Sequence, residues 1–399
     1  MSRADVIVVG GGVNGCSIAY RLAEAGRKVL LLERRGLASG ASGRNGGLTG
    51  GGSAMHSEAG RAVYAITMAN LALMQTLPEE LHADISLALP GNMDIATTPE
   101  MFEHLRHSVE AQRAAGMDVH LLDTKQARDL MPALSEEILG AEFAPGRGHL
   151  WPFALVLAFA DNARRLGAEI RTGVTVERLI IEGDRVRGVI ANGERIEAND
   201  VVLATNAYTP HLLPDLPKGA IVPARGQILA TQPVPAAIPH PFGTNFDKEY
   251  GRQTLTGQLI CGGYRRLDVD EGLGREEERT STPVLAGIAR CLATLFPAAR
   301  GVKVVRAWAG VMGFTADGLP LIGRYDAIQG LTVAVGFNGS GFSWAAITGK
   351  IVARLLTDEE PGFDLGVFTP TRFHGGSTVW KNPFTAGEKS NASGAVAVS

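Results

Sequence analysis

The sequence predicts a fold of the α/β class, and three features of the chain support that prediction. First, the apolar run Val6–Val9 is followed by a glycine turn, a helix with an apolar stripe and a second apolar run, Val29–Leu32. Short apolar runs of this kind are typical of strands buried on both faces of a parallel sheet. Second, a strand, a glycine turn and a helix recur at residues 331–356. Third, residues 221–267 show a succession of short strand patterns that is typical of an antiparallel sheet. We therefore expect an α/β (α+β) protein with a Rossmann-type domain and a second domain built on an antiparallel sheet.

The first glycine turn carries the most specific signal. Gly10, Gly12 and Gly15 stand in G-x-G-x-x-G spacing. In a Rossmann unit these glycines make the tight turn, let the backbone approach a pyrophosphate and let helix and strand pack closely. Glu33 ends the second strand, where a carboxylate can accept hydrogen bonds from ribose hydroxyls. Because strand, helix and acid accompany the glycines, the motif predicts dinucleotide binding rather than a glycine-rich turn in an ordinary α/β unit.

The stretch that begins at Arg34 is dense in glycine and serine. Such a composition is often that of a flexible linker. Its position directly after the second strand favours instead a loop that closes over a pyrophosphate with backbone N–H and hydroxyl donors. The candidate cofactor contacts in this loop are Arg34, Ser42, Gly43, Asn45 and Gly46.

Helical periodicity continues through the next part of the chain. It predicts helices at residues 58–82, 99–115, 124–132 and from about 152 onward. His104 and His107 are three residues apart on one of these helices, a spacing that a metal site can use. No third ligand stands nearby in the sequence, and charged residues share the same polar face, so we expect no metal site.

Residues 173–209 are typical of three or four short strands. Asp184 and Asn192-Gly193 are hairpin turn signals, and a buried strand at 201–203 then runs into a turn of small residues. We interpret this region as a second part of the nucleotide-binding fold. Val176 in the first of these strands and Thr205 in the last turn are candidate cofactor contacts.

The second glycine turn differs from the first in its spacing. Gly336, Gly339 and Gly341 follow a buried strand and precede a helix. A helix N-terminus stabilises negative charge, and reduced flavin carries such charge at its N1/C2=O edge. We therefore expect Gly339, Ser340, Gly341 and Phe342 to face a flavin; a turn with only a packing role is the alternative.

The composition bounds the function classes. With 399 residues and a net charge of −3, the chain is long enough for two or three domains and gives no indication of nucleic-acid or anionic-membrane binding. Its three cysteines, Cys16, Cys261 and Cys291, are far apart in the sequence, which fits a reduced, cytoplasmic protein without disulfides. The first strand begins close to Met1 and leaves no room for a signal peptide. No apolar run approaches the ~18 residues of a membrane-spanning helix.

In its motifs and their order the chain resembles the D-amino-acid-oxidase-like superfamily of FAD enzymes, the sarcosine oxidase, glycine oxidase and γ-glutamylputrescine oxidase group. The motifs are VIVVGGGVNG with Glu33, ASGASGRNGG, VVLATNAYT, YGRQTLTGQLICGGYRR, WAGVMGFTADGLPLIG and VGFNGSGFSWAAITGK. They cover nearly the whole chain up to about Phe373. The combination is specific, although no single piece would be.

The resemblance implies a flavoprotein oxidoreductase with non-covalent FAD. It implies a discontinuous FAD-binding domain at residues 1–86, 146–220 and 302–373, a substrate domain at 87–145 and 221–301, and a flexible tail at 374–399. The implied reaction oxidises the C–N bond of an amine or amino acid derivative: a hydride passes from the carbon next to the amine to flavin N5, and the imine is hydrolysed. The implied partners are a small-molecule amine substrate and oxygen or another electron acceptor, with a homo- or hetero-oligomer open.

The chain departs from the family pattern at four positions. Gly310 stands where sarcosine-oxidase-like enzymes carry a flavin-linking cysteine, which implies non-covalent FAD. Met312 stands where glycine-oxidase-like enzymes have a carboxylate-binding arginine, and Ser343 where sarcosine-oxidase-like enzymes have a carboxylate-binding lysine. Cys261 takes the place of an oxygen-activating lysine. These departures leave the amine and the electron acceptor open.

Tyr250 matches the family's tyrosine over the flavin. Arg252 shares its strand face by period two. A guanidinium fork suits a carboxylate, so Arg252 is the candidate for the missing carboxylate clamp; a solvated edge-strand arginine is the alternative. Together with Met312 and Ser343, these two residues form the predicted substrate site.

Two other interpretations stay open at this point. One is a nicotinamide-dependent dehydrogenase, which the first glycine motif alone would permit. The other is a flavin-bearing subunit of a heteromeric amino- or imino-acid dehydrogenase, whose turnover needs a partner.

Overall fold

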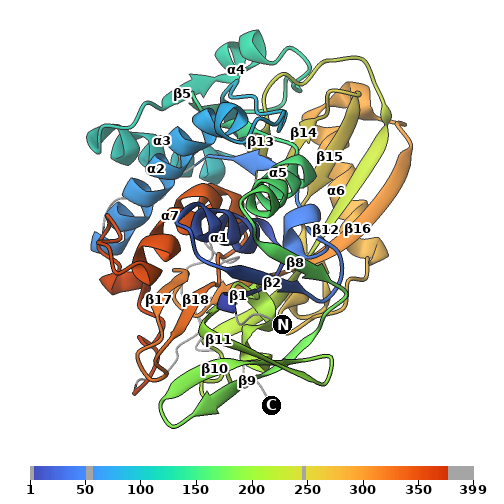
Figure 1. Ribbon diagram of the computed structural model, residues 1–399. Helices are drawn as coiled ribbons and strands as arrows, with labels where there is room; N and C mark the ends of the chain where they lie inside the picture. The colour runs from blue at the N-terminus through green and yellow to red at the C-terminus, as the bar shows by residue number, and fades with distance from the viewer. Residues whose placement is uncertain (1–3, 51–56, 245–248, 376–399) are drawn as a thin grey trace. The chain divides into compact units, whose positions relative to one another are not determined.

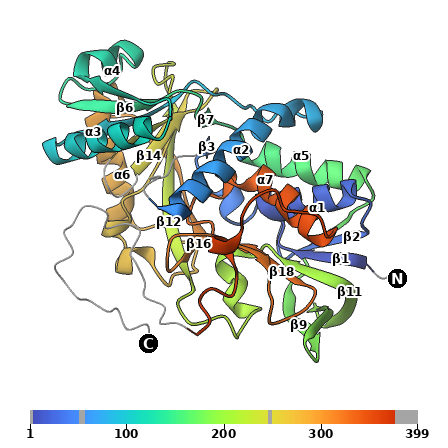
Figure 2. The same ribbon diagram turned by 90° about the vertical axis from the view of Figure 1, so that its left-hand side faces the viewer.

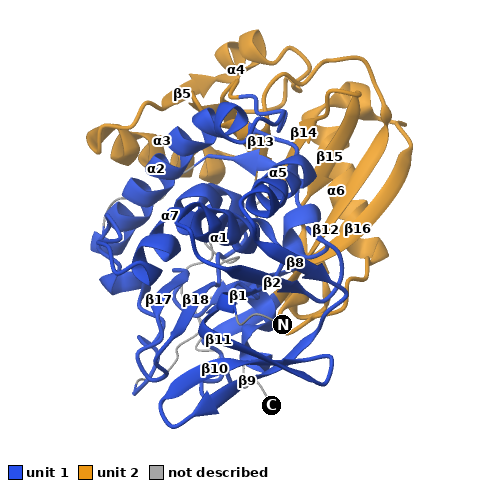
Figure 3. Ribbon diagram, viewed as in Figure 1, with its two compact units in different colours: residues 1–88, 149–223, 311–379 blue, residues 89–148, 224–310, 380–399 orange. Residues whose placement is uncertain are grey.

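The computed structural model describes residues 4–50, 57–244 and 249–375 (Figure 1). These residues form two compact units (Figure 3). The first unit takes its described residues from the segments 1–88, 149–223 and 311–379, and the second takes them from 89–148 and 224–310. The assignment of FAD binding to the first set of segments and of substrate binding to the second stays a prediction. The tail predicted to be flexible lies outside the described residues from 376 onward.

The first unit is organised around a sheet whose main path runs β17-β18-β11-β1-β2-β8 (Figure 1). Five of these strands are parallel to their neighbours, and β17 is antiparallel to β18. The strands are β1 (Ala4–Val9), β2 (Val29–Glu33), β8 (Glu169–Thr172), β11 (Glu194–Leu203), β17 (Leu321–Arg324) and β18 (Leu331–Val335). The opening strand thus pairs with a segment that comes much later in the chain.

Both faces of this sheet are buried because its central strands are apolar along their length. In β1, Val6 and Val8 pack into the core that the helices form, whereas Ile7 and Val9 pack into the core on the opposite face. The helices on the first face are α1 (Val13–Glu24), α2 (Glu58–Glu80), α5 (Pro152–Arg165) and α7 (Ala345–Leu356). α1 packs against both α5 and α7 (Figure 1).

A hairpin extends the sheet beyond β11. It consists of β9 (Val176–Glu182) and β10 (Arg185–Ala191), and β10 pairs with β11. Asn192 and Gly193 connect β10 to β11 with φ of 48° and 78°. Two successive residues in the left-handed region make the turn whose twist matches antiparallel strands, so the predicted Asn-Gly turn is confirmed. The first unit also contains the short strand β3 (Leu48–Thr49). A further short strand, β7 (Gly148–His149), lies at a unit boundary.

The second unit is built on a sheet with the order β16-β12-β15-β14-β13-β4-β6-β5. Its strands are β4 (Asn92–Ala96), β5 (His120–Asp123), β6 (Gly140–Ala144), β12 (Ile221–Pro233), β13 (Phe242–Thr244), β14 (Glu249–Gln253), β15 (Gln258–Gly262) and β16 (Val304–Thr315). β12 and β15, β15 and β14, β14 and β13, β4 and β6, and β6 and β5 pair antiparallel, whereas β13 and β4 pair parallel. The helices are α3 (Pro99–Ala114), α4 (Thr124–Leu130) and α6 (Thr282–Leu295). Both α3 and α4 pack against β6 (Figure 2).

The predicted fold class is confirmed, with parallel strands in the first unit and a largely antiparallel sheet in the second. One element differs from its prediction. The helix expected directly after the second glycine turn begins only at Ala345, because a separate 3-10 turn at Gly341–Ser343 comes first. Within the described residues, no helix combines the length and apolar character that crossing a membrane requires.

Candidate functional site

The first glycine turn is fixed by close backbone packing. Gly10 has a φ of +113°, and a Cβ on it would lie 2.7 Å from the carbonyl oxygen of Ala204. A Cβ on Gly15 would lie 1.9 Å from the carbonyl oxygen of Gly10. Any side chain at either position would collide with main chain, so β1, α1 and the end of β11 approach one another only because these residues are glycines.

The start of α1 is joined to the loop that follows β2. Ser42 Oγ accepts a hydrogen bond from the Val13 N–H at 2.9 Å. A Cβ on Gly12 would lie 3.0 Å from the same oxygen. Gly12 is the N-cap of α1 and offers no side-chain cap of its own. The helix therefore begins with N–H groups that a neighbouring loop or an anionic ligand satisfies.

Glu33 ends β2 where the sequence placed a ribose-binding acid. Its Oε2 accepts from the Gly11 N–H at 2.7 Å, and its Oε1 accepts from the Arg35 N–H at 2.8 Å. Each carboxylate oxygen has a second lone pair, so two backbone bonds still leave acceptor capacity. The bonds hold the carboxylate beside the glycine turn.

The loop that follows β2 is ordered by Asn45. Its Nδ2 donates to the carbonyl oxygens of Ala41 and Ser42, at 3.0 and 2.8 Å, and its Oδ1 accepts from the Gly47 N–H at 2.7 Å. Gly43 packs tightly as well, since a Cβ there would lie 2.2 Å from a backbone oxygen. These contacts make the segment a folded loop, which supports the ligand-loop interpretation over a linker.

Four further predicted cofactor contacts, Arg34, Gly46, Val176 and Thr205, also lie in the first unit. Gly46 is buried next to β3. The guanidinium of Arg34 lies 3.8 Å from the centre of the Tyr208 ring. Val176 begins β9, and Thr205 Oγ1 lies 2.9 Å from Thr209 Oγ1.

Two asparagines that sequence reasoning missed hold the second glycine turn. Asn206 Oδ1 accepts from the N–H of Gly336 at 3.0 Å. Asn338 Oδ1 accepts from the Thr315 N–H at 2.9 Å, and Asn338 Nδ2 donates to the Gly336 carbonyl oxygen at 2.7 Å. Both asparagines have a positive φ, 47° and 51°. Asparagine tolerates this conformation, and the Asn338-Gly339 pair was a turn signal that could have drawn attention to it.

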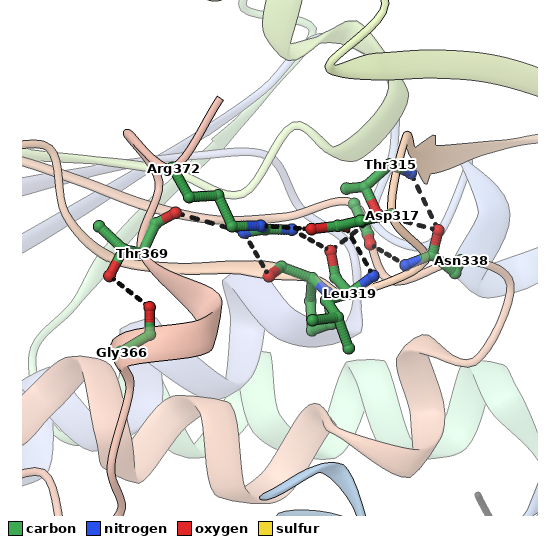
Figure 4. A network of polar contacts seen from close by, with 9 residues as sticks. Thr315, Asp317, Leu319, Asn338, Gly366, Thr369 and Arg372 are labelled. Carbon is green, nitrogen blue, oxygen red and sulfur yellow. Dashed lines mark hydrogen bonds and ion pairs between the residues drawn. The ribbon is translucent and has the colours of Figure 1, made fainter. Parts of the chain in front are cut away.

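The network around Asn338 extends to Arg372, near the end of the described chain (Figure 4). Arg372 makes a bidentate ion pair with Asp317, with N–O distances of 2.7 and 2.9 Å. It also donates to the carbonyl oxygens of Leu319 and Thr369. Thr315 Oγ1 donates to Leu319 O at 2.7 Å, so one continuous set of bonds joins Arg372 to the second glycine turn.

Two of the predicted substrate-site residues lie beside the second glycine turn. A Cβ on Gly339 would lie 3.5 Å from Met312 Sδ, so Met312 packs on this turn. Ser343 is buried, and its Oγ donates to the Gly50 carbonyl oxygen at 2.6 Å. That hydroxyl therefore ties two loops of the first unit together. Gly310, the departure that implied non-covalent FAD, is buried within β16.

The two glycine turns are neighbours within the first unit. Asn14, in the first turn of α1, donates through Nδ2 to the Gly341 carbonyl oxygen at 3.5 Å. Its Oδ1 is buried and accepts no hydrogen bond within the described residues. Asn70 of α2 donates to the Phe342 carbonyl oxygen at 3.1 Å and accepts from the Ala346 N–H at 2.9 Å. Asn14 thus joins the start of α1 to the second turn, and Asn70 joins the same turn to α2.

The second unit brings Tyr250 and two arginines together. Tyr250 and Arg252 are two positions apart on β14, so their side chains project from the same face of the sheet. Burial raises the pKa of Tyr250 to about 12 although the positive charge of Arg265 opposes the shift. Burial lowers the pKa of Arg265 to about 10 and also lowers that of Arg252. Arg252 is only 8% exposed, so the alternative of a solvated edge arginine is wrong.

Cys261 faces the other side of the same sheet. It pairs with Leu229 and Gly251 and lies in the apolar core of the second unit. Burial and a hydrogen bond with Cys291 hold its pKa well above the usual range of a thiol. The position that matches the oxygen-activating lysine therefore holds a neutral core side chain. No described group of three or more His, Cys, Asp or Glu residues is arranged to hold a metal ion.

The sequence pattern of the family described as FAD dependent oxidoreductase matches residues 5–355. The chain belongs to this family. The predicted family, the FAD cofactor and the oxidoreductase class are thereby confirmed.

Three relatives show how far the similarity extends. Glycine oxidase of Geobacillus kaustophilus is 29% identical over 384 residues, which cover 94% of this chain and 98% of that enzyme. Its crystal structure matches with a TM-score of 0.85 at 26% identity, over 93% of this chain and 99% of that one. Sarcosine oxidase subunit beta of an Arthrobacter species is 28% identical over 387 residues, covering 94% of this chain and 92% of the subunit.

The third relative is much longer than this chain. Mitochondrial dimethylglycine dehydrogenase of Rattus norvegicus is 26% identical over 394 residues, which cover 93% of this chain but 45% of that protein. The chain therefore spans less than half the length of that relative.

The residues of the first unit fit FAD. The turn at Gly10–Gly15 has no Cβ that would keep a pyrophosphate away from the start of α1, and Ser42 lies at the same helix start. Glu33 keeps acceptor capacity for a ribose. The buried Oδ1 of Asn14 adds a polar group between the two glycine turns. The individual FAD contacts stay predictions.

Proposed function

We propose that this chain oxidises the C–N bond of an amino acid derivative with FAD as the oxidant. The observation that carries the proposal is the face of β14, where Tyr250 stands with the buried guanidinium of Arg252 and near the half-buried Arg265. Buried cations suit a substrate carboxylate. The relatives support the same class, because they are named for glycine, sarcosine and dimethylglycine, each an amine with a carboxylate.

We assign the FAD contacts to the two glycine turns and the loops beside them. When bound, FAD supplies the hydride acceptor, so the protein needs no dedicated acid–base pair. The proposed contacts are Gly10, Gly12, Gly15, Glu33, Arg34, Ser42, Gly43, Asn45, Gly46, Val176, Thr205, Gly310, Gly339, Ser340, Gly341 and Phe342. The binding is proposed to be non-covalent because position 310 is a glycine.

The substrate is proposed to bind through its carboxylate. Arg252 and Arg265 supply the positive charge, and Tyr250 stays protonated at neutral pH, so its O–H donates a hydrogen bond. Met312 contributes apolar surface that disfavours the ammonium form of the substrate. Ser343 is proposed to act through loop positioning, since its hydroxyl is bonded to Gly50.

Anaerobic reduction of the flavin by a panel of amines and amino acids tests the proposal. We expect bleaching of the flavin band near ~450 nm by amino acid derivatives. Arg252→Ala should raise KM for carboxylate-bearing substrates about 10- to 100-fold, because a charged hydrogen bond is lost. Arg290→Ala, an exposed arginine of α6, is the matched control.

The two parts of the proposal fail separately. If no amine reduces the flavin, the proposed function is wrong. If amines reduce it but the Arg252→Ala variant keeps the KM of the unchanged protein, only the carboxylate role is wrong. Timed reoxidation in air, compared with dyes, then distinguishes oxygen from another acceptor. The cytoplasmic location expected from the sequence belongs to this proposal.

A second candidate is a flavin-bearing subunit that needs a partner. It is favoured by the similarity to a protein named as a subunit and by the greater length of dimethylglycine dehydrogenase. Gel filtration combined with an amine-plus-dye assay distinguishes the two. Turnover by the isolated chain supports the free-standing enzyme, and flavin reduction without turnover supports the subunit.

A further inference from the structure

One row of residues crosses five strands of the second unit. Glu142 of β6 pairs with Asp94 of β4, and Asp94 pairs with Gly243 of β13. Gly243 pairs with Tyr250 of β14, and Tyr250 pairs with Gly262 of β15. Paired residues project from the same face of a sheet. Both carboxyl groups therefore share the face that carries Tyr250, although they come from distant parts of the chain.

The glycines in this row determine how the side chains lie. A Cβ on Gly243 would lie 2.1 Å from Asp94 Oδ1, so the carboxyl group occupies the space over Gly243. A Cβ on Gly262 would lie 2.9 Å from Tyr250 Cζ and Oη, so the ring lies over Gly262. Asp94 and Tyr250 are two strands apart, about 10 Å along the sheet. Gly243 adds no side chain between them.

The acidic end of the row carries a net negative charge. Arg147 Nη1 lies 4.0 Å from Glu142 Oε1, and Arg147 also acts on Asp94. The neutral side chain of Gln112, from α3, donates to both oxygens of Glu142 at 2.9 and 3.0 Å. Two carboxylates thus share one guanidinium.

Of the two carboxyl groups, Asp94 is the one that can meet a ligand. Glu142 is only 4% exposed and is bonded to Gln112 of the covering helix α3. Asp94 is half-buried and leans over Gly243, toward the strand of Tyr250. The face therefore has a negative end at Asp94 and a positive end at Arg252 and Arg265.

We propose that Asp94 is a specificity-determining residue that binds a second, cationic nitrogen of the substrate. The inference rests on the proposed function and narrows its substrate class to amino acid derivatives that carry two nitrogen groups. The amine whose neighbouring carbon gives up the hydride must be neutral to react, so it cannot form an ion pair with a carboxylate. The partner of an ionised Asp94 is accordingly a different nitrogen, one that keeps its positive charge.

This recognition depends on pH. Burial and the neighbouring charge of Glu142 together raise the pKa of Asp94 to about 6, against the opposing effects of Arg147 and of a hydrogen bond with Asn92. Gly243 contributes no charge from β13. Above pH 6 Asp94 is ionised and binds the cation, whereas below pH 6 it is protonated and the preference is lost.

The test measures anaerobic reduction of the flavin by L-lysine and by L-norleucine. The same comparison is then made with D-lysine and D-norleucine. The chains of these probes match except for the terminal cation. The measured quantity is the rate constant of flavin reduction divided by Kd. For the unchanged protein at pH 8 we expect this quantity to be about 10- to 100-fold higher for lysine than for norleucine of the same configuration. Asp94→Asn should abolish most of that preference, and the preference of the unchanged protein should fall between pH 7 and pH 5.

Control variants separate specificity from folding. Asp129→Asn changes an exposed aspartate of α4 and should keep the preference for lysine. Asp94→Glu keeps the charge and should retain part of the preference even if Asp94→Asn folds poorly. Equal use of lysine and norleucine by the unchanged protein, or an undiminished preference in the Asp94→Asn variant, overturns the inference while the proposed function stands. Absence of flavin reduction by any amine overturns both.

Discussion

The two glycine turns of the first unit are held in place by different means. The first, Gly10–Gly15, is fixed by main chain against main chain at its two ends, because a Cβ on Gly10 or on Gly15 would strike a backbone oxygen. The second, Gly336–Gly341, is fixed by side-chain hydrogen bonds to distant segments: Asn206, from the loop after β11, accepts from the Gly336 N–H, and Asn338 of the turn accepts from the Thr315 N–H of β16. The first turn therefore depends on a local spacing, and the second depends on long-range partners.

This difference predicts different responses to mutation. A turn made by close backbone contact does not tolerate added atoms, because the main chain on both sides is part of the core. A turn held by side-chain hydrogen bonds can move when one bond is lost, because its glycines still permit other conformations. Damage to the first turn should affect folding and FAD content together, whereas damage to the second should alter the bound flavin first.

The largest expected effect is that of Gly15→Ala. Its Cβ would lie 1.9 Å from the Gly10 carbonyl oxygen, so β1 and α1 must separate. We expect a loss of about 3 kcal/mol in the free energy of unfolding, the upper end of what overpacking a core typically costs. Thermal unfolding and FAD content of the purified protein measure the effect.

Gly40→Ala is the matched control for this change. No atom lies within 4 Å of a Cβ placed on Gly40, and its φ of −83° suits any residue. A Gly15→Ala variant as stable and as yellow as the Gly40→Ala variant would contradict the role assigned to close backbone contact.

The next effect is that of Asn338→Ala. The change removes the acceptor of the Thr315 N–H and the donor to the Gly336 carbonyl oxygen. We expect a loss of roughly 2–3 kcal/mol, because buried groups are left without partners. The flavin absorbance and its reduction potential should change more than the affinity for FAD.

An exposed asparagine of the first unit provides the comparison for Asn338. Asn199→Ala, in β11, should leave stability and flavin spectrum unchanged. If Asn338→Ala lowers FAD affinity but leaves the spectrum of the bound flavin intact, the second turn does not face the flavin ring, and the packing alternative is favoured.

The sequence revealed the first turn more fully than the second for the same physical reason. The first turn is formed within one strand–helix–strand unit that contains Gly10, Gly12, Gly15 and Glu33. Their spacing in the sequence is therefore enough to predict that they lie together. The partners of Asn338 depend on which strands lie side by side, and one sequence does not specify that. Ser343 shows the same limit, since its bond to Gly50 joins residues almost three hundred positions apart.

The same limit applies to the face of the second unit's sheet that carries Tyr250. Period two alone placed Arg252 beside Tyr250, because both lie on one strand. The sequence did not predict Asp94 on this face, because its position there follows from the pairing of β4 with β13 and of β13 with β14. The antiparallel sheet could be predicted from alternation, but its register could not.

The smallest effect in the comparison is that of Arg372→Ala, which acts on the second turn from a distance. The variant loses the bidentate ion pair with Asp317 and several bonds to carbonyl oxygens. We expect a loss of about 1–2 kcal/mol at pH 7, the size of a partly buried charged hydrogen-bond set. Arg324→Ala, whose ion pair with Asp358 is exposed, should cost less and serves as the control.

The pH dependence of this loss identifies its cause. Burial raises the pKa of Asp317, but hydrogen bonds from Arg372, the Leu319 N–H and Thr315 hold it below the usual range of an aspartate. A carboxyl whose pKa is lowered by folding stabilises the protein above its unfolded pKa, about 3.9, and that stabilisation is lost as the pH falls through the folded value. The difference in unfolding free energy between the unchanged protein and Arg372→Ala should therefore be constant from pH 8 to about pH 5 and shrink below about pH 4. Denaturant unfolding at a series of pH values measures it. A difference that persists undiminished into acid would mean that Arg372 acts through its bonds to the carbonyl oxygens of Leu319 and Thr369 and not through its ion pair with Asp317.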